Sequence, residues 1–131
     1  MTTRSIDTAP IRVRDVAVAD HTIHLYESGD AGTPTIVFLH GSGPAATGLS
    51  NWEAALGEFG DRYHCLAPDI VGFGDSSHPN PPPAGMVAFT DLRADAVLGL
   101  LDALGIERCT FVGNSMGGMI TLTIALRAPE R

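Results

Sequence analysis

The pentapeptide Gly113-Asn114-Ser115-Met116-Gly117 fits the pattern G-x-S-x-G and decides how the rest of the chain is interpreted. An apolar, β-rich segment at 109–112 precedes it, and an apolar segment at 118–126 follows it. This order predicts a strand, a sharp turn and a helix, the context in which the pattern forms a nucleophile elbow. Gly113 and Gly117 are expected to be structural, because a side chain there would collide with the neighbouring strand or helix. Ser115 is the candidate nucleophile; the alternative is a chance match in which the serine only caps the helix.

The chain does not contain the base that such a serine needs. In enzymes with this elbow an acid and then a histidine follow the serine, but residues 116–131 hold no His or Asp, and Glu130 is their only acid. All five histidines lie upstream: His21, His24, His40, His64 and His78. We therefore interpret residues 1–131 as the N-terminal part of an enzyme, inactive alone. The alternative is a noncatalytic truncated chain that serves as a binding module; against it, the last strand and helix would leave a hydrophobic edge uncovered.

Composition narrows the class of protein. A chain of 131 residues with 44% hydrophobic and 18% charged residues fits one globular domain. The net charge of −7, with every basic residue an arginine, argues against binding to nucleic acid or to an anionic membrane. We expect no signal peptide and no membrane span. Cys65 and Cys109 are interpreted as reduced core residues of a cytoplasmic protein. No metal or cofactor is expected, because no histidine pair or cysteine cluster has ligand spacing.

Hydrophobic periodicity predicts an α/β architecture with a parallel sheet and crossover helices. Alternating apolar residues at 11–18 and 21–26 predict an N-terminal β-hairpin at a sheet edge. The continuous apolar run at 35–39 predicts a central strand covered on both faces. Further expectations are helices at 49–59 and 92–104, a strand at 63–67, a surface loop at 72–85 and a C-terminal cap at Gly105.

A second loop is expected to face the serine. His40-Gly41-Ser42-Gly43-Pro44 directly follows the strand at 35–39, and ligands in open α/β sheets bind beyond the carboxyl ends of strands. Acyl transfer needs two N–H donors for the oxyanion; the amide of Met116 is one candidate, and that of Ser42 is the other. We expect His40 to hold the loop by hydrogen bonds rather than to act as the base. The alternative interpretation of the loop is a plain Gly-Pro turn.

Three motifs carry a resemblance to the α/β-hydrolase superfamily from about residue 11 to the end: 40–44, 69–76 and 113–118. In the second, Asp69 is interpreted as a hydrogen-bonding residue of a tight turn. The first and third, together with Ser50-Asn51-Trp52, are similar to the meta-cleavage product hydrolases, which split a C–C bond in 2-hydroxy-6-oxo-dienoates. One departure is Ala45, where that family usually has glycine.

The resemblance implies roles for particular residues and for the complete enzyme. Ser115 matches the nucleophile, the amides of Ser42 and Met116 match the oxyanion hole, and Asn51, Asn114 and Gly43 match substrate contacts, with His40, Gly41, Gly113 and Gly117 shaping the site. The alternatives are that Asn51 only caps a helix and that Asn114 is only a residue tolerated at the strained turn. The resemblance also implies a small-molecule substrate and a homo-oligomer. It implies, too, that a lid and the catalytic acid and histidine lie outside residues 1–131. A carboxylesterase or lactonase of the same fold is the alternative function.

Overall fold

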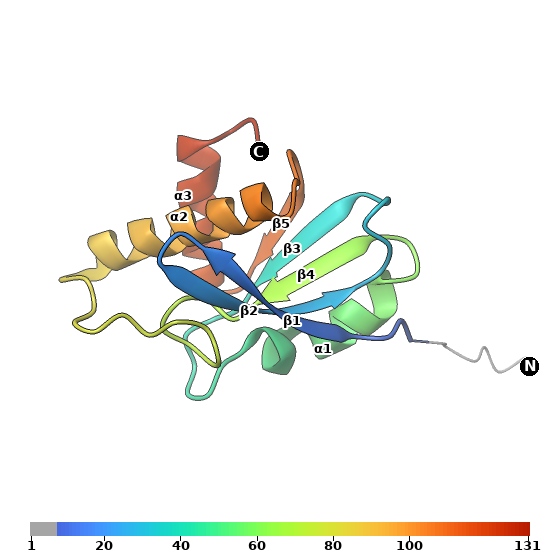
Figure 1. Ribbon diagram of the computed structural model, residues 1–131, viewed down its shortest axis with the longest axis horizontal. Coiled ribbons are helices and arrows are strands. Elements are labelled where there is room, and N and C mark those ends of the chain that lie inside the picture. Colours follow the sequence, from blue (N-terminus) through green and yellow to red (C-terminus); the bar gives the residue numbers. More distant parts are fainter. Residues whose placement is uncertain (1–7) are drawn as a thin grey trace, which may run out of the picture.

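A five-stranded sheet and three helices make up the fold (Figure 1), which a computed structural model describes for residues 8–131. The strands are β1 (Arg12–Val18), β2 (His21–Ser28), β3 (Thr35–Leu39), β4 (His64–Pro68) and β5 (Thr110–Gly113). The helices are α1 (Gly48–Phe59), α2 (Met86–Ala103) and α3 (Met116–Arg127). The order across the sheet is β1-β2-β4-β3-β5.

The predicted hairpin and the predicted parallel part of the sheet are both present. β1 and β2 pair antiparallel, and β1 is one edge of the sheet. β2 joins β4 antiparallel, while β3 pairs parallel with β4 on one side and with β5 on the other. The sheet is therefore mixed, with β3 at the centre of its parallel part.

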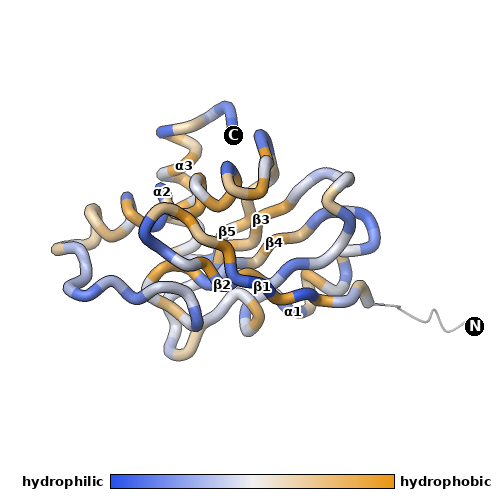
Figure 2. Tube along the Cα trace, in the orientation of Figure 1, coloured by the Kyte–Doolittle hydropathy of each residue, from blue (hydrophilic) through white to orange (hydrophobic). Residues whose placement is uncertain are grey.

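The helices cover both faces of the sheet. Because β4 and β5 lie on opposite sides of β3, right-handed crossovers place α1 on one face and α2 on the other, as Figure 1 shows. The larger hydrophobic core lies beneath α2 and α3, and the smaller core, with Phe38, Leu56, Cys65 and Ala67, lies beneath α1. In Figure 2 the hydrophobic stretches concentrate in β3, β5 and the helices.

One predicted boundary is wrong: α2 begins at Met86, well before residue 92. The side chains of Met86 and Val87 are 72% and 77% exposed, so this first turn does not continue the apolar stripe from which the helix was predicted. The predicted end is confirmed. Gly105, with φ +70°, donates its N–H to Asp102 O at 3.1 Å, and Ile106 N–H reaches Leu101 O at 2.8 Å. These two bonds form a Schellman cap.

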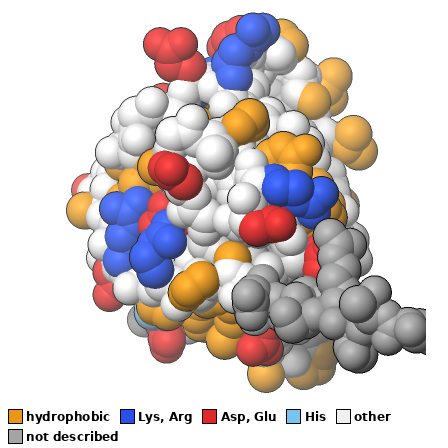
Figure 3. Space-filling model, turned by 90° about the vertical axis from the view of Figure 1, so that its right-hand side faces the viewer, with side chains coloured by type: hydrophobic (Ala, Val, Ile, Leu, Met, Phe, Trp, Pro, Cys, Tyr) orange, Lys and Arg blue, Asp and Glu red, His pale blue; other side chains and the backbone are white. Residues whose placement is uncertain are grey.

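The expected uncovered hydrophobic edge is present at β5 and α3. β5 is the second edge of the sheet, and Leu122 and Leu126 of α3 are 67% and 86% exposed, with Val112 and Met119 also partly exposed. The face in Figure 3 is different, because its hydrophobic side chains are scattered among acidic and basic ones. The exposed apolar side chains of the β5–α3 edge therefore lie mainly on α3.

Candidate active site

Ser115 occupies a strained turn between β5 and α3. Its backbone has φ +54° and ψ −110°, a region that a non-glycine residue adopts at a cost on the order of 1–3 kcal/mol. Ser115 stands at the N-cap position of α3, yet its side chain makes no capping hydrogen bond. The interpretation of this serine as a simple helix cap is therefore wrong. Ser115 is exposed, and its hydroxyl makes no hydrogen bond with any group in residues 8–131.

The glycines beside Ser115 lie against backbone. A Cβ added to Gly117 would stand 2.1 Å from Leu39 O, and one added to Gly113 would stand 2.4 Å from Gly117 O. Main-chain atoms at the end of a central strand or within a helix cannot rotate away. Neither position therefore has room for a side chain, and the elbow is packed directly on the end of β3.

The loop after β3 lies beside the elbow. Asn114 donates its N–H to Leu39 O at 3.0 Å, and a Cβ added to Gly41 would stand 3.6 Å from Ser115 Cβ. The chain leaves β3 toward α1 and leaves β5 toward α3, and these helices lie on opposite faces of the sheet (Figure 1). Such a reversal at the carboxyl ends of adjacent strands is the usual ligand-binding crevice of an open α/β sheet.

Two backbone N–H groups at this crevice are available. Within residues 8–131 neither the N–H of Ser42 nor that of Met116 donates to a protein group. The neighbouring N–H of Gly41, in contrast, donates to Asn51 Oδ1 at 3.2 Å, and that of Gly117 donates to Asn114 O at 2.9 Å. The two N–H groups that the sequence proposes as oxyanion donors therefore make no internal hydrogen bond in the described part of the chain.

A Gly-Pro turn, the alternative interpretation of this loop, is also present within it. Ala46 N–H donates to Gly43 O at 3.0 Å, and Ala45 has φ +57°. A positive φ at the third residue of a four-residue turn, directly after a proline at the second, is typical of a type II turn, which favours glycine there. Ala45 thus keeps a backbone conformation suited to the glycine that it replaces in the resembling family.

His40 is buried, and both of its ring nitrogens are engaged. Nδ1 donates to Gly41 O at 2.7 Å, and Nε2 accepts the N–H of Ile70 at 2.9 Å, so the ring is neutral with its proton on Nδ1. Burial lowers the pKa of His40 below its ordinary 6.5, although the bond to Gly41 and the charge of Asp69 oppose this shift. The ring ties the loop after β3 to the loop after β4 and has no nitrogen left for Ser115.

Asp69 closes the turn after β4. Its buried carboxylate accepts the N–H of Gly48 at 2.8 Å and the N–H of Asp75 at 3.0 Å, which fastens the start of α1 to this turn. Together with His24 and Asp75 it also forms a group of potential metal ligands within 4.8 Å of one another. Sequence spacing does not reveal this group, since His24 lies on β2. Both oxygens of Asp69 already accept backbone N–H groups, so its place in the structure is that of a turn residue.

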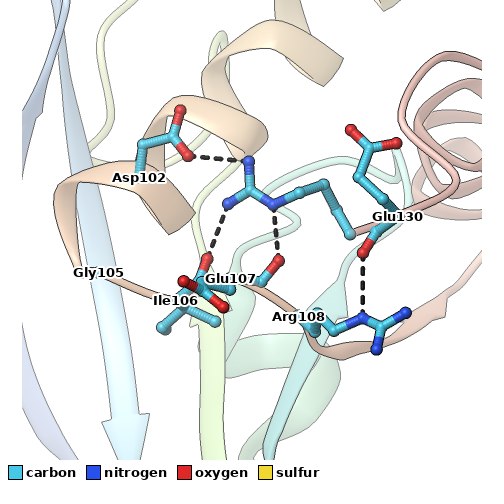
Figure 4. A pocket seen from close by; sticks show the side chains of 7 residues that line it. Asp102, Gly105, Ile106, Glu107, Arg108 and Glu130 are labelled. Carbon is cyan, nitrogen blue, oxygen red and sulfur yellow. Dashed lines mark hydrogen bonds and ion pairs between the residues drawn. The ribbon is translucent and has the colours of Figure 1, made fainter.

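A surface hollow of about 620 Å³ lies away from the elbow, at the opposite end of β5 (Figure 4). Arg131 lines this hollow, and its guanidinium donates to Ile106 O at 2.7 Å and Glu107 O at 2.8 Å, with an ion pair to Asp102 at 2.8 Å. All of its nitrogens are therefore occupied. No residue of the elbow or of the loop after β3 lines this hollow, which is lined by Asp102, Gly105, Ile106, Glu107, Arg108, Glu130 and Arg131.

The two cysteines form no disulfide with each other. Cys65 is buried and free, as predicted, and Cys109 is free and half-buried. Burial raises the pKa of the Cys109 thiol to about 11, so this thiol is protonated at neutral pH.

Among the described helices, none combines the length and the apolar character needed to cross a membrane.

Residues 34–131 match the family described as the alpha/beta hydrolase fold, and the chain belongs to that family. It is 41% identical over 118 residues to a 2-hydroxymuconate semialdehyde hydrolase of Pseudomonas sp. strain CF600, an alignment that covers 90% of this chain and 40% of the relative. It is 38% identical to a 2-hydroxy-6-oxo-6-phenylhexa-2,4-dienoate hydrolase of Comamonas testosteroni, with 92% and 40% covered. The chain thus spans about 40% of the length of these curated relatives.

Solved structures show the same relationship. The 2-hydroxy-6-oxo-6-phenylhexa-2,4-dienoate hydrolase of Rhodococcus sp. strain RHA1 superposes with a TM-score of 0.91 at 36% identity, over 95% of this chain and 44% of that one. A serine hydrolase from the polyaromatic-hydrocarbon-degrading bacterium Cycloclasticus zankles superposes with a TM-score of 0.89 at 43% identity, over 93% and 43%. The resemblance to the meta-cleavage product hydrolases that the motifs indicated is therefore confirmed.

Proposed function

We propose that the protein containing this chain is a serine-dependent hydrolase that cleaves the C–C bond of a 2-hydroxy-6-oxo-dienoate. The observation that carries this proposal is the strained turn at Ser115 beside the two free N–H groups of Ser42 and Met116. The relatives named as dienoate hydrolases support the substrate class.

The proposed chemistry uses these groups in turn. The dienol first tautomerises to a ketone, which makes the departing carbon a stabilised leaving group. The carbonyl at the bond to be broken then binds between the amides of Ser42 and Met116, and either Ser115 or a water positioned by it adds to that carbon. The C–C bond breaks with its electron pair on the leaving carbon, which takes up a proton. Water supplies the oxygen of the carboxylic acid product.

The donors carry much of the catalysis in this scheme. Removing one oxyanion donor from such a site raises the barrier by on the order of 3 kcal/mol. Asn51, Asn114 and Gly43 border the same crevice and are proposed substrate contacts. Residues 1–131 are proposed as part of a single domain whose lid, acid and histidine lie elsewhere in the complete protein, a cytoplasmic homo-oligomer.

The test uses the complete gene product that contains this sequence, called the complete protein below. The wild type is expected to consume a 2-hydroxy-6-oxo-dienoate, and Ser115→Ala is expected to abolish turnover while the fold, followed by circular dichroism, survives. Ser42→Ala is the matched control, because it removes a hydroxyl and keeps the backbone N–H.

Two results would contradict the proposal. C–C hydrolysis that persists in Ser115→Ala refutes the assignment of this serine. Turnover of a simple aryl ester without turnover of the dienoate identifies the protein as an esterase or lactonase of the same fold.

A further inference from the structure

One side-chain oxygen joins the two loops of the candidate active site. Asn51 Oδ1, on the first turn of α1, accepts the N–H of Gly41 at 3.2 Å and the Nδ2–H of Asn114 at 3.1 Å. Gly41 directly precedes Ser42, and Asn114 directly precedes Ser115. The carboxamide of Asn51 is thus bonded to the residue before one candidate donor and to the residue before the candidate nucleophile.

The orientation of both side-chain amides follows from the backbone. A backbone N–H can only donate, so the atom of Asn51 that faces Gly41 is its oxygen. The atom of Asn114 that faces this oxygen is then its nitrogen. Asn51 is left with its own Nδ2 group, whose one hydrogen bond within residues 8–131 is a long one of 3.5 Å to Ser50 Oγ.

Asn51 stands on a firmly held helix terminus. Thr47 and Ser50 form a capping box, in which Ser50 N–H donates to Thr47 Oγ1 at 3.0 Å and Thr47 N–H donates to Ser50 Oγ at 2.9 Å. Gly48 N–H is bound by the buried carboxylate of Asp69. Since the helix itself is anchored, the bonds of Asn51 place the two loops relative to a fixed frame. The alternative of a helix cap at Asn51 is wrong, because Thr47 occupies the N-cap position.

We propose that Asn51 is a positioning residue whose carboxamide oxygen sets the spacing between the Ser42 N–H and the Ser115–Met116 turn. This inference rests on the proposed function of the same site. Because the N–H of Gly41 is bound by Asn51, it cannot serve the oxyanion, and the next N–H along the loop does. The role belongs to Asn51 Oδ1, and is therefore separate from a substrate contact, which would use its Nδ2 group.

The first test measures kcat and KM of Asn51→Ala in the complete protein with two substrates, the dienoate and an aryl acetate that lacks its carboxylate. We expect kcat to fall by at least about tenfold on both, since loss of a whole oxyanion donor costs about 100- to 1,000-fold. KM on both is expected to stay within about twofold. Glu53→Ala is the matched control, because Glu53 is exposed on the same helix and makes no hydrogen bond within residues 8–131.

The second test follows hydrogen exchange of the Gly41 amide by NMR. Asn51→Ala is expected to speed this exchange, whereas Asn114→Ala leaves the Gly41 bond in place and slows kcat less. A rise of KM for the dienoate alone, or an unchanged kcat with both substrates, overturns the proposal. An unchanged Gly41 exchange rate in Asn51→Ala also overturns it. If the wild type hydrolyses neither substrate, the proposed function fails, and the exchange result still decides whether Asn51 holds the loop.

Discussion

Replacing Gly117 by alanine tests the close contact on which the elbow rests. The added Cβ would stand 2.1 Å from Leu39 O, 2.6 Å from Leu39 C and 2.9 Å from His40 O, all of them backbone atoms. To reach the 3.4 Å at which ordinary contact begins, the start of α3 and the end of β3 must separate by about 1.3 Å. Overpacking of this kind costs about 1–3 kcal/mol, whereas alanine gains at most about 1 kcal/mol over glycine in a helix.

The expected net effect is a loss of about 1–2 kcal/mol in the free energy of unfolding. We expect kcat to fall by at least about tenfold as well, because the displaced end of β3 carries the loop of Ser42. Urea denaturation of the complete protein measures the first quantity, and turnover of the dienoate measures the second.

Gly118→Ala is the matched control for this prediction. The nearest atom to its added Cβ is Gly113 O at 3.5 Å, an ordinary contact. This variant is expected to gain about 0.5–1 kcal/mol from its helix propensity. Equal stability of the two variants, or full activity in Gly117→Ala, would refute the reasoning that the elbow packs on β3 without room for a methyl group.

Three further predictions concern the loop, its histidine and the exposed helix. Ala45→Gly is expected to raise the free energy of unfolding by about 0.5 kcal/mol, since relief of about 1–2 kcal/mol of left-handed strain exceeds the entropy that glycine adds to the unfolded chain; a lower urea midpoint would contradict this. Burial lowers the pKa of His40 from 6.5, so the neutral ring's contribution to the free energy of unfolding is complete above pH 6.5 and decreases as the pH falls below it, where the unfolded state takes up the proton first. Urea midpoints measured against pH should therefore decrease below pH 6.5, and His40→Gln should remove this contribution. Residues 1–131 produced alone are expected to aggregate, and Leu122→Ser with Leu126→Ser to improve solubility; a soluble, cooperatively melting monomer of the unaltered chain would refute this.

The local pattern was enough to predict most elements and the central turn. The apolar run of β3 and the alternating hairpin signal their conformation within a few residues, because burial on one or two faces repeats along the strand. The start of α2 was not predicted, because this part of the helix is not buried. Met86 and Val87 are helical and apolar but exposed, so they do not belong to the buried stripe whose helical spacing predicts the rest of α2.

The candidate site was predictable only in part. Ser115, Ser42 and Met116 could be named from motifs, because each lies in a short contiguous segment, 113–117 for the strained turn and 40–44 for the loop after β3. The metal-ligand-like group of His24 with Asp69 and Asp75, and the binding of Gly48 by Asp69, were not predicted. Each joins the turn after β4 to a residue of β2 or α1, and no sequence spacing records that proximity.

By itself, then, the sequence determined the order of strands and helices, the position of the strained serine and the family, because these depend on residue types at short spacing. Only the tertiary structure decided that Asn51 holds Gly41 and Asn114 together, that both nitrogens of His40 are occupied, and that β5 and α3 form the exposed apolar edge. Asn51 and Asn114 are 63 positions apart. Their contact exists because β5 pairs with β3 rather than with β4, which brings two carboxyl ends of strands to one crevice.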